Sequence, residues 1–135
     1  MRTVLLILML LVPCIAGADG GVITKTEIKR DVTVEPPHTR PVCILQGSLP
    51  TAYTFREIGR IKATKRTYGG VDELNGPIAD EARRVDADAI INYIADQRFK
   101  SPLPWRVRAP TGMGVAVQLV GGQALDCAAL RGQSF

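Results

Sequence analysis

The stretch VDELNGPIADEARRVDADAIINYIADQRF, residues 71–99, decides the fold, because its hydrophobic spacing changes from helical to extended within a few residues. In the first half, apolar residues recur at intervals of three or four, which places them on one face of a helix. These residues are Val71, Leu74, Ile78, Ala82 and Val85. In the second half, residues 87–99 carry apolar side chains on both faces of an extended segment, which is typical of a central strand.

Pro77 interrupts the predicted helix and leaves two alternatives for its beginning. The helix begins either at Pro77, directly after Gly76, or near Asp72 with a bend at the proline. Acidic residues come early in the segment, and Arg83 and Arg84 come late, an order that suits the helix dipole. Both alternatives predict one main helix that leads into a buried strand.

Two strands are predicted ahead of the helix. Residues 42–45 form a short apolar run between a proline and a glycine, which indicates a buried strand. Residues 53–64 alternate between apolar and polar side chains except around Gly59. A bulge at Gly59 would return Ile58 to the inner face and turn Glu57 outward.

After residue 99 the chain again reads as strands and turns. Residues 105–108 alternate as a short strand, residues 110–112 have the composition of a turn, and residues 113–119 alternate as a last strand. Residues 121–135 are a tail, for which a helical turn around residues 125–130 is the predicted structure.

These elements define the predicted organisation of the chain. Residues 1–18 are a signal peptide, and residues 19–40 are an extended N-terminal arm with a proline-rich loop, in which residues 22–34 read as an early strand or as extended chain. Residues 41–120 are an α+β domain with one main helix on a mainly antiparallel sheet of about five to six strands. Residues 121–135 follow as the C-terminal tail.

The first residues predict export. Arg2 precedes the apolar run of residues 4–12, which is far shorter than the roughly 20 residues that a membrane span needs. Pro13 ends this run, and small residues up to Ala18 fit a signal peptidase, with Asp19 as the new N-terminus. The predicted location is therefore periplasmic or secreted.

Lipoprotein processing at Cys14 is the alternative. A leucine stands three residues before Cys14, as lipidation requires, but Pro13 occupies the place of the small residue that normally precedes the cysteine. Lipidation would make the protein an outer-membrane lipoprotein, and only then would it bind a membrane through an anchor.

The number of cysteines also favours cleavage after Ala18. If Cys14 leaves with the signal peptide, Cys43 and Cys127 remain as an even pair in an oxidising compartment. We expect a disulfide between them, which would tie the tail to an early strand. The alternative is two unpaired, buried cysteines.

Three motifs carry a family resemblance: EIGRIKA at residues 57–63, IADEARRVDADAIIN at 78–92 and GMGVAVQL at 112–119. In order and spacing they resemble the YbjQ-type domain family, often labelled heavy-metal-binding, and small Gram-negative envelope proteins, including outer-membrane stress-sensor lipoproteins of the Rcs type. The resemblance covers about residues 43–119 and implies this α+β fold and a role in stress sensing or envelope maintenance. The family usually has glycine where this chain has Asp86, a residue that tolerates a left-handed helix cap.

The residues contain no convincing catalytic or metal-ligating constellation. His38 is the single histidine, and we expect it on an exposed loop. Cys43 follows it by five residues and could form a nucleophile and base with it, but an exported cysteine is expected to be oxidised or buried. No pair of ligands has metal-binding spacing. We therefore predict no enzyme activity and no cofactor.

The charge pattern predicts an interaction face. The chain carries a formal net charge of +4. Cations on two predicted strands form either the ordinary polar side of those strands or a basic docking face: Arg56, Arg60, Lys62, Lys65, Arg66, Arg106 and Arg108. Trp105 either anchors such an interface or packs in the core. For an exported protein, an envelope protein or an anionic envelope surface is a more natural partner than nucleic acid.

The leading hypothesis is thus a non-enzymatic envelope protein that docks on a partner. A small-ligand or metal-binding periplasmic protein, a lipoprotein anchored through Cys14 and a cryptic enzyme are the alternatives, and the oligomeric state is left open.

Overall fold

The computed structural model describes residues 21–99 and 108–135 of the chain. The predicted signal peptide, its cleavage site at Ala18 and Asp19, and Cys14 lie outside the described residues, as do Trp105 and Arg106.

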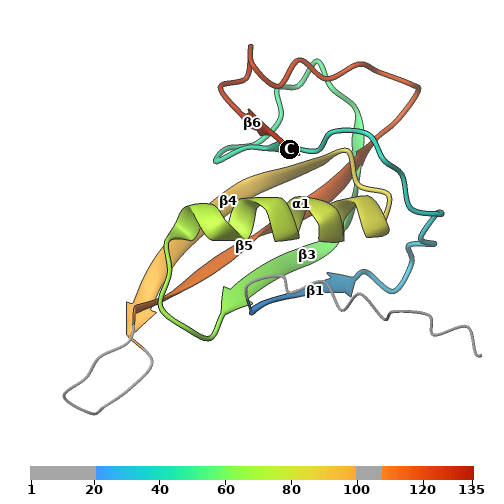
Figure 1. The fold of residues 1–135 in the computed structure, drawn as a ribbon. Coiled ribbons are helices and arrows are strands. Elements are labelled where there is room, and N and C mark those ends of the chain that lie inside the picture. Colours follow the sequence, from blue (N-terminus) through green and yellow to red (C-terminus); the bar gives the residue numbers. More distant parts are fainter. Residues whose placement is uncertain (1–20, 100–107) are drawn as a thin grey trace, which may run out of the picture.

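One sheet of six strands forms the body of the protein, with the helix α1 (Asn75–Arg84) across one face (Figure 1). The strands are β1 (Val22–Ile28), β2 (Cys43–Ile44), β3 (Phe55–Lys65), β4 (Ala89–Phe99), β5 (Arg108–Leu119) and β6 (Gln133–Ser134), in the spatial order β1-β3-β5-β4-β2-β6. All neighbours pair antiparallel except β2 and β4. The predicted α+β class is confirmed, and of the two alternatives for the early residues the strand is correct.

The helical stretch begins before the proline. A 3-10 turn, η1 (Val71–Leu74), leads directly into α1, so the helical stretch begins near Asp72, as in the second alternative, and the α-helix itself begins at Asn75. Pro77 lies in the first turn of α1, where its missing N–H would have had no partner within the helix. The predicted apolar stripe faces the sheet, because Leu74, Ile78 and Ala82 are fully buried.

The predicted bulge in β3 is confirmed. Glu57 pairs with Val117 and Gly59 pairs with Ala116, so Ile58 is the extra residue of β3. Ile58 is buried under α1, whereas Glu57 turns outward and forms an ion pair with Lys29 at 2.5 Å. The bulge therefore changes which residues of β3 point to each face of the sheet.

The turn predicted at residues 110–112 is wrong, because β5 continues through it. Thr111 pairs with Asp96 and Gly112 pairs with Ala95, along the second half of β4. Glycine stands at 112 for a packing reason: a Cβ there would lie 2.5 Å from the hydroxyl oxygen of Tyr93. Of the separate strand expected at 105–108, only Arg108 is described, and it is the first residue of β5; residues 105–107 lie outside the described residues.

The tail closes the far edge of the sheet. The predicted disulfide between Cys43 and Cys127 is confirmed, with a Cα–Cα distance of 5.6 Å. Residues 127–131 form turns, and the tail then adds the short strand β6 beside β2, a strand that no sequence pattern indicated. Val42 and Phe135 exchange two backbone hydrogen bonds of 2.8 and 3.0 Å. The tail is therefore part of the fold.

Tyr93 is a buried polar group in the helix-side core. Its side chain packs with Ile90 and Ala116, and among the described residues its hydroxyl has no hydrogen-bond partner. Burial raises the pKa of Tyr93. The folded protein thus holds the phenol in its neutral form.

Removing the hydroxyl of Tyr93 is not expected to lower the free energy of unfolding at neutral pH. Tyr93→Phe should leave the free energy of unfolding unchanged or raise it by up to about 1 kcal/mol, because no hydrogen bond is lost. Since the folded pKa is raised, stability should fall as pH rises beyond the pKa of an unfolded tyrosine, about 10, and the variant should lose less there. Urea unfolding at neutral and alkaline pH measures both effects; a clear loss in the variant at neutral pH would reveal a partner for the hydroxyl.

Candidate functional site

The sheet face opposite α1 is covered over only part of its area. The tail and the residues before β3 pack on one half of this face, around Cys43, Leu49 and Val117. On the other half, a direct row of side chains crosses four neighbouring strands, and we call it the open row. Its members are Lys25 of β1, Lys62 of β3, Met113 of β5 and Ile94 of β4, which are successive pairing partners.

The open row combines unpaired positive charge with exposed apolar surface. Ile94 is 67% exposed and Met113 is 45% exposed. Lys25 and Lys62 stand directly opposite each other, and the structure gives neither an ion-pair partner among the described residues. Like charges directly opposite each other destabilise a sheet, so folding alone does not favour this arrangement.

Arg60 adds a third cation beside the open row. It precedes Lys62 by two residues and pairs with Glu27 of β1 and Val115 of β5. No hydrogen bond to a side chain is formed by Arg60 in the described part of the chain. In the middle of β3 the two faces therefore differ: Arg60 and Lys62 lie on the open side, and Ile61 and Ala63 lie buried on the helix side.

Two of the other predicted basic residues, Arg56 and Lys65, do not join this surface. Because of the bulge, Arg56 points to the helix side, where it donates to Gln118 at 2.6 Å. Lys65 also lies on the helix side and is buried against Glu73, and this ammonium group holds the pKa of Glu73 below its usual range. Arg108 begins β5. Of the predicted face, the structure places Arg60 and Lys62 side by side on the open side of β3, whereas Arg106 and the side chain of Arg108 lie outside what it describes.

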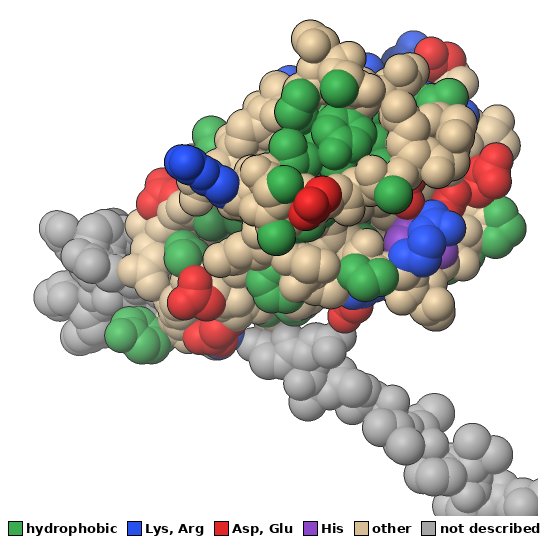
Figure 2. All heavy atoms as spheres, turned by 90° about the horizontal axis from the view of Figure 1, so that it is seen from above, with side chains coloured by type: hydrophobic (Ala, Val, Ile, Leu, Met, Phe, Trp, Pro, Cys, Tyr) green, Lys and Arg blue, Asp and Glu red, His purple; other side chains and the backbone are tan. Residues whose placement is uncertain are grey.

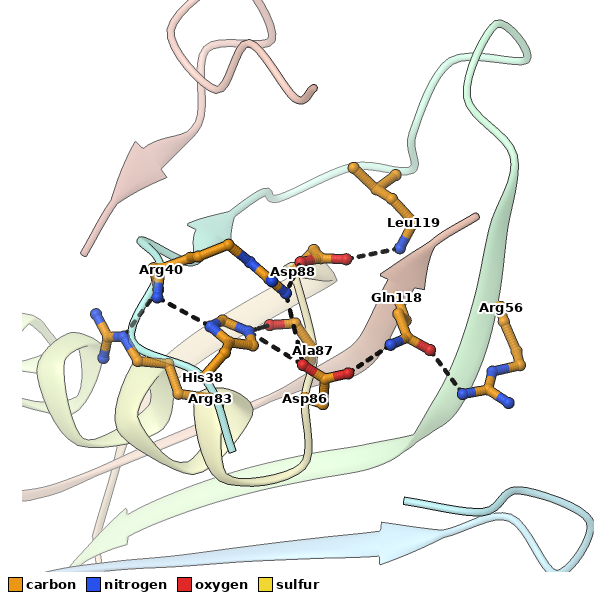
Figure 3. A network of polar contacts seen from close by, with 9 residues as sticks. All are labelled: His38, Arg40, Arg56, Arg83, Asp86, Ala87, Asp88, Gln118 and Leu119. Atoms are coloured by element: carbon orange, nitrogen blue, oxygen red, sulfur yellow. Dashed lines mark hydrogen bonds and ion pairs between the residues drawn. The ribbon is translucent and has the colours of Figure 1, made fainter. Parts of the chain in front are cut away.

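A polar network at the junction of α1 and β4 is the second notable cluster (Figure 3). Its centre is the buried carboxylate of Asp86, whose backbone has a positive φ of 57°. This carboxylate accepts hydrogen bonds from Gln118 at 2.6 Å and from Arg40 at 3.5 Å. Asp88 accepts from Arg40 and from the backbone N–H of Leu119, both at 2.9 Å.

His38 belongs to this network, and its predicted exposure is wrong. Its side chain is only 8% exposed, because Nε2 donates to the carbonyl of Ala87 at 2.6 Å. Nδ1 accepts from the backbone N–H of Arg40 at 3.0 Å, so both ring nitrogens are satisfied by a neutral imidazole. The proline-rich loop around His38 carries no sequence signal for the surface on which it docks.

The network fixes the arm to the body of the protein. Residues 38–40 are held to the end of α1 and the start of β4, and Arg83 also donates to the carbonyl of Arg40 at 3.0 Å. The side chains drawn in Figure 3 include no serine, threonine, cysteine or tyrosine that could act as a nucleophile. Across the described residues, no three His, Cys, Asp or Glu side chains are grouped to hold a metal ion.

Asp86 offers a test of this interpretation. Asp86→Ala should lower the free energy of unfolding by about 2 kcal/mol, because it removes a buried charged acceptor and leaves a positive φ on alanine. Asp86→Asn should lower the free energy of unfolding much less, since asparagine keeps an acceptor oxygen and tolerates that backbone conformation. Urea unfolding of both variants measures the difference, and equal costs would contradict a role for the acceptor.

A hollow of about 300 Å³ lies between the start of the helical stretch and the tail. Asp72, Asn75, Tyr93, Arg131 and Gln133 are among the residues that line it. Arg131 has a positive φ of 56° and no ion-pair partner within the described ranges. Figure 2 looks at the molecule from the end that carries the tail, where hydrophobic side chains gather near the centre and charged ones lie around them.

Comparisons with known proteins add no relative. No helix in the part of the chain that the structure describes is long and apolar enough to cross a membrane. No family model matches the sequence, and no curated protein or solved structure matches the chain. The resemblance to YbjQ-type domains accordingly stays a prediction from the three motifs, and the α+β class is the level of classification that the structure establishes.

Proposed function

We propose that this chain is an exported, non-enzymatic envelope protein that docks on an anionic partner through the open row and Arg60. The observation that carries the proposal is the pair of directly opposed lysines, Lys25 and Lys62, beside exposed Met113 and Ile94. A partner that brings carboxylates or phosphates to this face would relieve the repulsion and cover the apolar side chains.

Export is supported by the leader sequence and by the disulfide. Cys43 and Cys127 are bonded, and disulfides persist in oxidising compartments such as the periplasm. A protein with this location meets acidic envelope proteins and anionic lipid or glycan surfaces, the two partner classes predicted from the charge. Because the cations are exposed, binding should weaken as the salt concentration rises.

Charge reversal tests the docking face. The double variant Arg60→Glu with Lys62→Glu should reduce retention on anionic vesicles or on an acidic envelope protein by about tenfold or more. The matched control reverses Arg30 and Arg131, two exposed cations away from the open row, and should retain normal binding. Vesicle sedimentation and pull-down from envelope extracts measure the two partner classes separately. Equal losses in both variants, or none in either, would contradict the proposal.

The hollow beside Arg131 favours a second candidate function, the binding of a small polar ligand. Its lining offers a guanidinium group, the carboxylate of Asp72 and the amides of Asn75 and Gln133 around apolar walls. Ligand-observed NMR with a library of small polar metabolites tests this alternative, and Arg131→Ala should abolish any hit. A metal version of the alternative is tested by calorimetry with zinc or copper.

Anchoring through Cys14 would hold the same docking module at the outer membrane. The intact mass of the protein from envelope fractions separates the alternatives, since lipidation leaves Cys14 as the modified first residue and cleavage after Ala18 removes it.

A further inference from the structure

β1 is the edge strand of the sheet in the part of the chain that the structure describes. It pairs with β3, and no strand among the described residues pairs with its other edge (Figure 1). On its helix side, Thr24 and Thr26 donate to the buried carboxylate of Glu81 at 3.4 and 2.8 Å, which fixes β1 under α1. β1 contains no proline and no bulge, two devices that commonly block strand addition.

The charges on β1 are arranged in a way that one partner strand would satisfy. Lys25 and Glu27 both point to the open face, where Lys25 stands opposite Lys62 and Glu27 stands opposite Arg60. The four residues therefore contain three cations and one carboxylate. A strand added at the outer edge would relieve the repulsion best if it placed a carboxylate beside Lys25 and a cation beside Glu27.

We propose that a second copy of this chain supplies that strand, so that β1 pairs antiparallel with β1 of its partner around Thr26. In this register, Thr26 faces the same residue of the second copy. Lys25 of each copy then faces Glu27 of the other, which gives two opposite-charge pairs by symmetry. The row Arg60, Glu27, then Lys25 and Lys62 of the second copy runs unbroken across the interface.

Neighbouring registers lack this complementarity. Pairing centred on Lys25 places the two lysines against each other, and pairing centred on Glu27 places the two carboxylates against each other and Lys25 against Lys29. A shift by one residue would set the helix side of one copy against the open side of the other. Among these registers the charges favour the one centred on Thr26, in which both helices lie on one face of a continuous sheet and both open rows lie on the other.

This inference goes beyond the proposed function, because it concerns the edge of the sheet rather than its face. A dimer of this kind would present two open rows side by side, so a partner surface would be bound at two points. Reversal of Arg60 and Lys62 tests docking and leaves both Lys25–Glu27 contacts intact. Lys25 belongs to the open row, so Glu27→Lys is the reversal within β1 that tests self-pairing without removing a cation from the docking face.

Sedimentation velocity of the purified, oxidised protein tests the dimer. The wild-type protein should dimerise, and each single reversal, Lys25→Glu or Glu27→Lys, should weaken dimerisation by about tenfold or more, since two attractions become two repulsions. The exchange variant that carries both substitutions should restore it. Lys25→Glu also places a carboxylate opposite Lys62, so its folding should not suffer, and a loss of dimer cannot be ascribed to unfolding.

Hydrogen exchange locates the interface independently. Amides of residues 22–28 should gain protection as the protein concentration rises, and those of the single-reversal variants should not. A wild-type protein that stays monomeric at the highest soluble concentration would overturn the proposal. So would a dimer that both single reversals leave intact, because its interface would then lie elsewhere.

Discussion

Loss of the Cys43–Cys127 disulfide should lower the free energy of unfolding by about 4 kcal/mol. This is the largest loss of stability that we expect from any of the substitutions proposed. The bond joins residues 84 positions apart, and closing so long a loop removes much of the conformational freedom of the unfolded chain. It also ties the tail, with β6, to β2. The double variant Cys43→Ala with Cys127→Ala should show the loss in urea unfolding.

Reducing agent supplies the matched control for this prediction. Reduction of the wild-type protein should give nearly the same loss, and the same reagent should not change the double variant. The tail should become sensitive to proteases in both cases, because β6 contributes only Gln133 and Ser134 to the sheet. A wild-type unfolding midpoint that does not move on reduction would contradict the role given to the disulfide.

Substitution of Gly59 should have the second large effect. A Cβ at this position would lie 2.0 Å from the carbonyl oxygen of Glu27 and 2.9 Å from the Cα of Ile28, both backbone atoms of β1. Backbone cannot move aside as a side chain end can, so β1 must separate from β3 or the bulge must rearrange. Gly59→Ala should therefore cost roughly 3 kcal/mol, at the upper end of overpacking changes.

Gly76 is the matched control for Gly59. It lies in the first turn of α1 and has no neighbouring atom within 4 Å of an added Cβ. Gly76→Ala should leave stability unchanged or raise it by up to about 1 kcal/mol, because alanine favours the helix. In Gly59→Ala, hydrogen exchange should accelerate in β1 before the rest of the sheet, and uniform acceleration would argue against a local clash.

Local patterns predicted the parts of the fold that depend on local physics. The apolar stripe through Leu74 and Ile78 fixed the helix face, and the broken alternation at Gly59 located the bulge, because each reports burial directly. The disulfide was predicted because signal cleavage would leave an even number of cysteines in an oxidising compartment. Each of these signals depends on residue type and spacing, which a sequence displays.

Long-range docking was the part that a single sequence did not reveal. The imidazole of His38 is buried beside a carbonyl 49 residues away, and β6 pairs with β2 across almost the whole length of the described chain. Gly112 was taken for a turn residue, although its small size serves the phenol of Tyr93. In each case the residue type was compatible with a loop, and only its tertiary neighbour explains it.

The candidate site was likewise predicted where it depends on local alternation and missed where it depends on strand pairing. Alternation along residues 53–64 assigned Arg56, Arg60 and Lys62 to one polar side. The bulge moves Arg56 to the helix side, so the real surface is smaller than predicted. The opposition of Lys25 and Lys62 could not be foreseen, because it depends on the register between β1 and β3.

Site-specific photocrosslinking in living cells is the most direct test of the claim that the open row docks on an envelope partner. A photoreactive amino acid in place of Met113 should give discrete adducts in the envelope fraction, and the same residue in place of Asp80, an exposed position on α1, should not. Arg60→Glu with Lys62→Glu should remove the Met113 adducts. Identical adducts from both positions, or no adduct from Met113 while the protein is present in the envelope, would contradict the account.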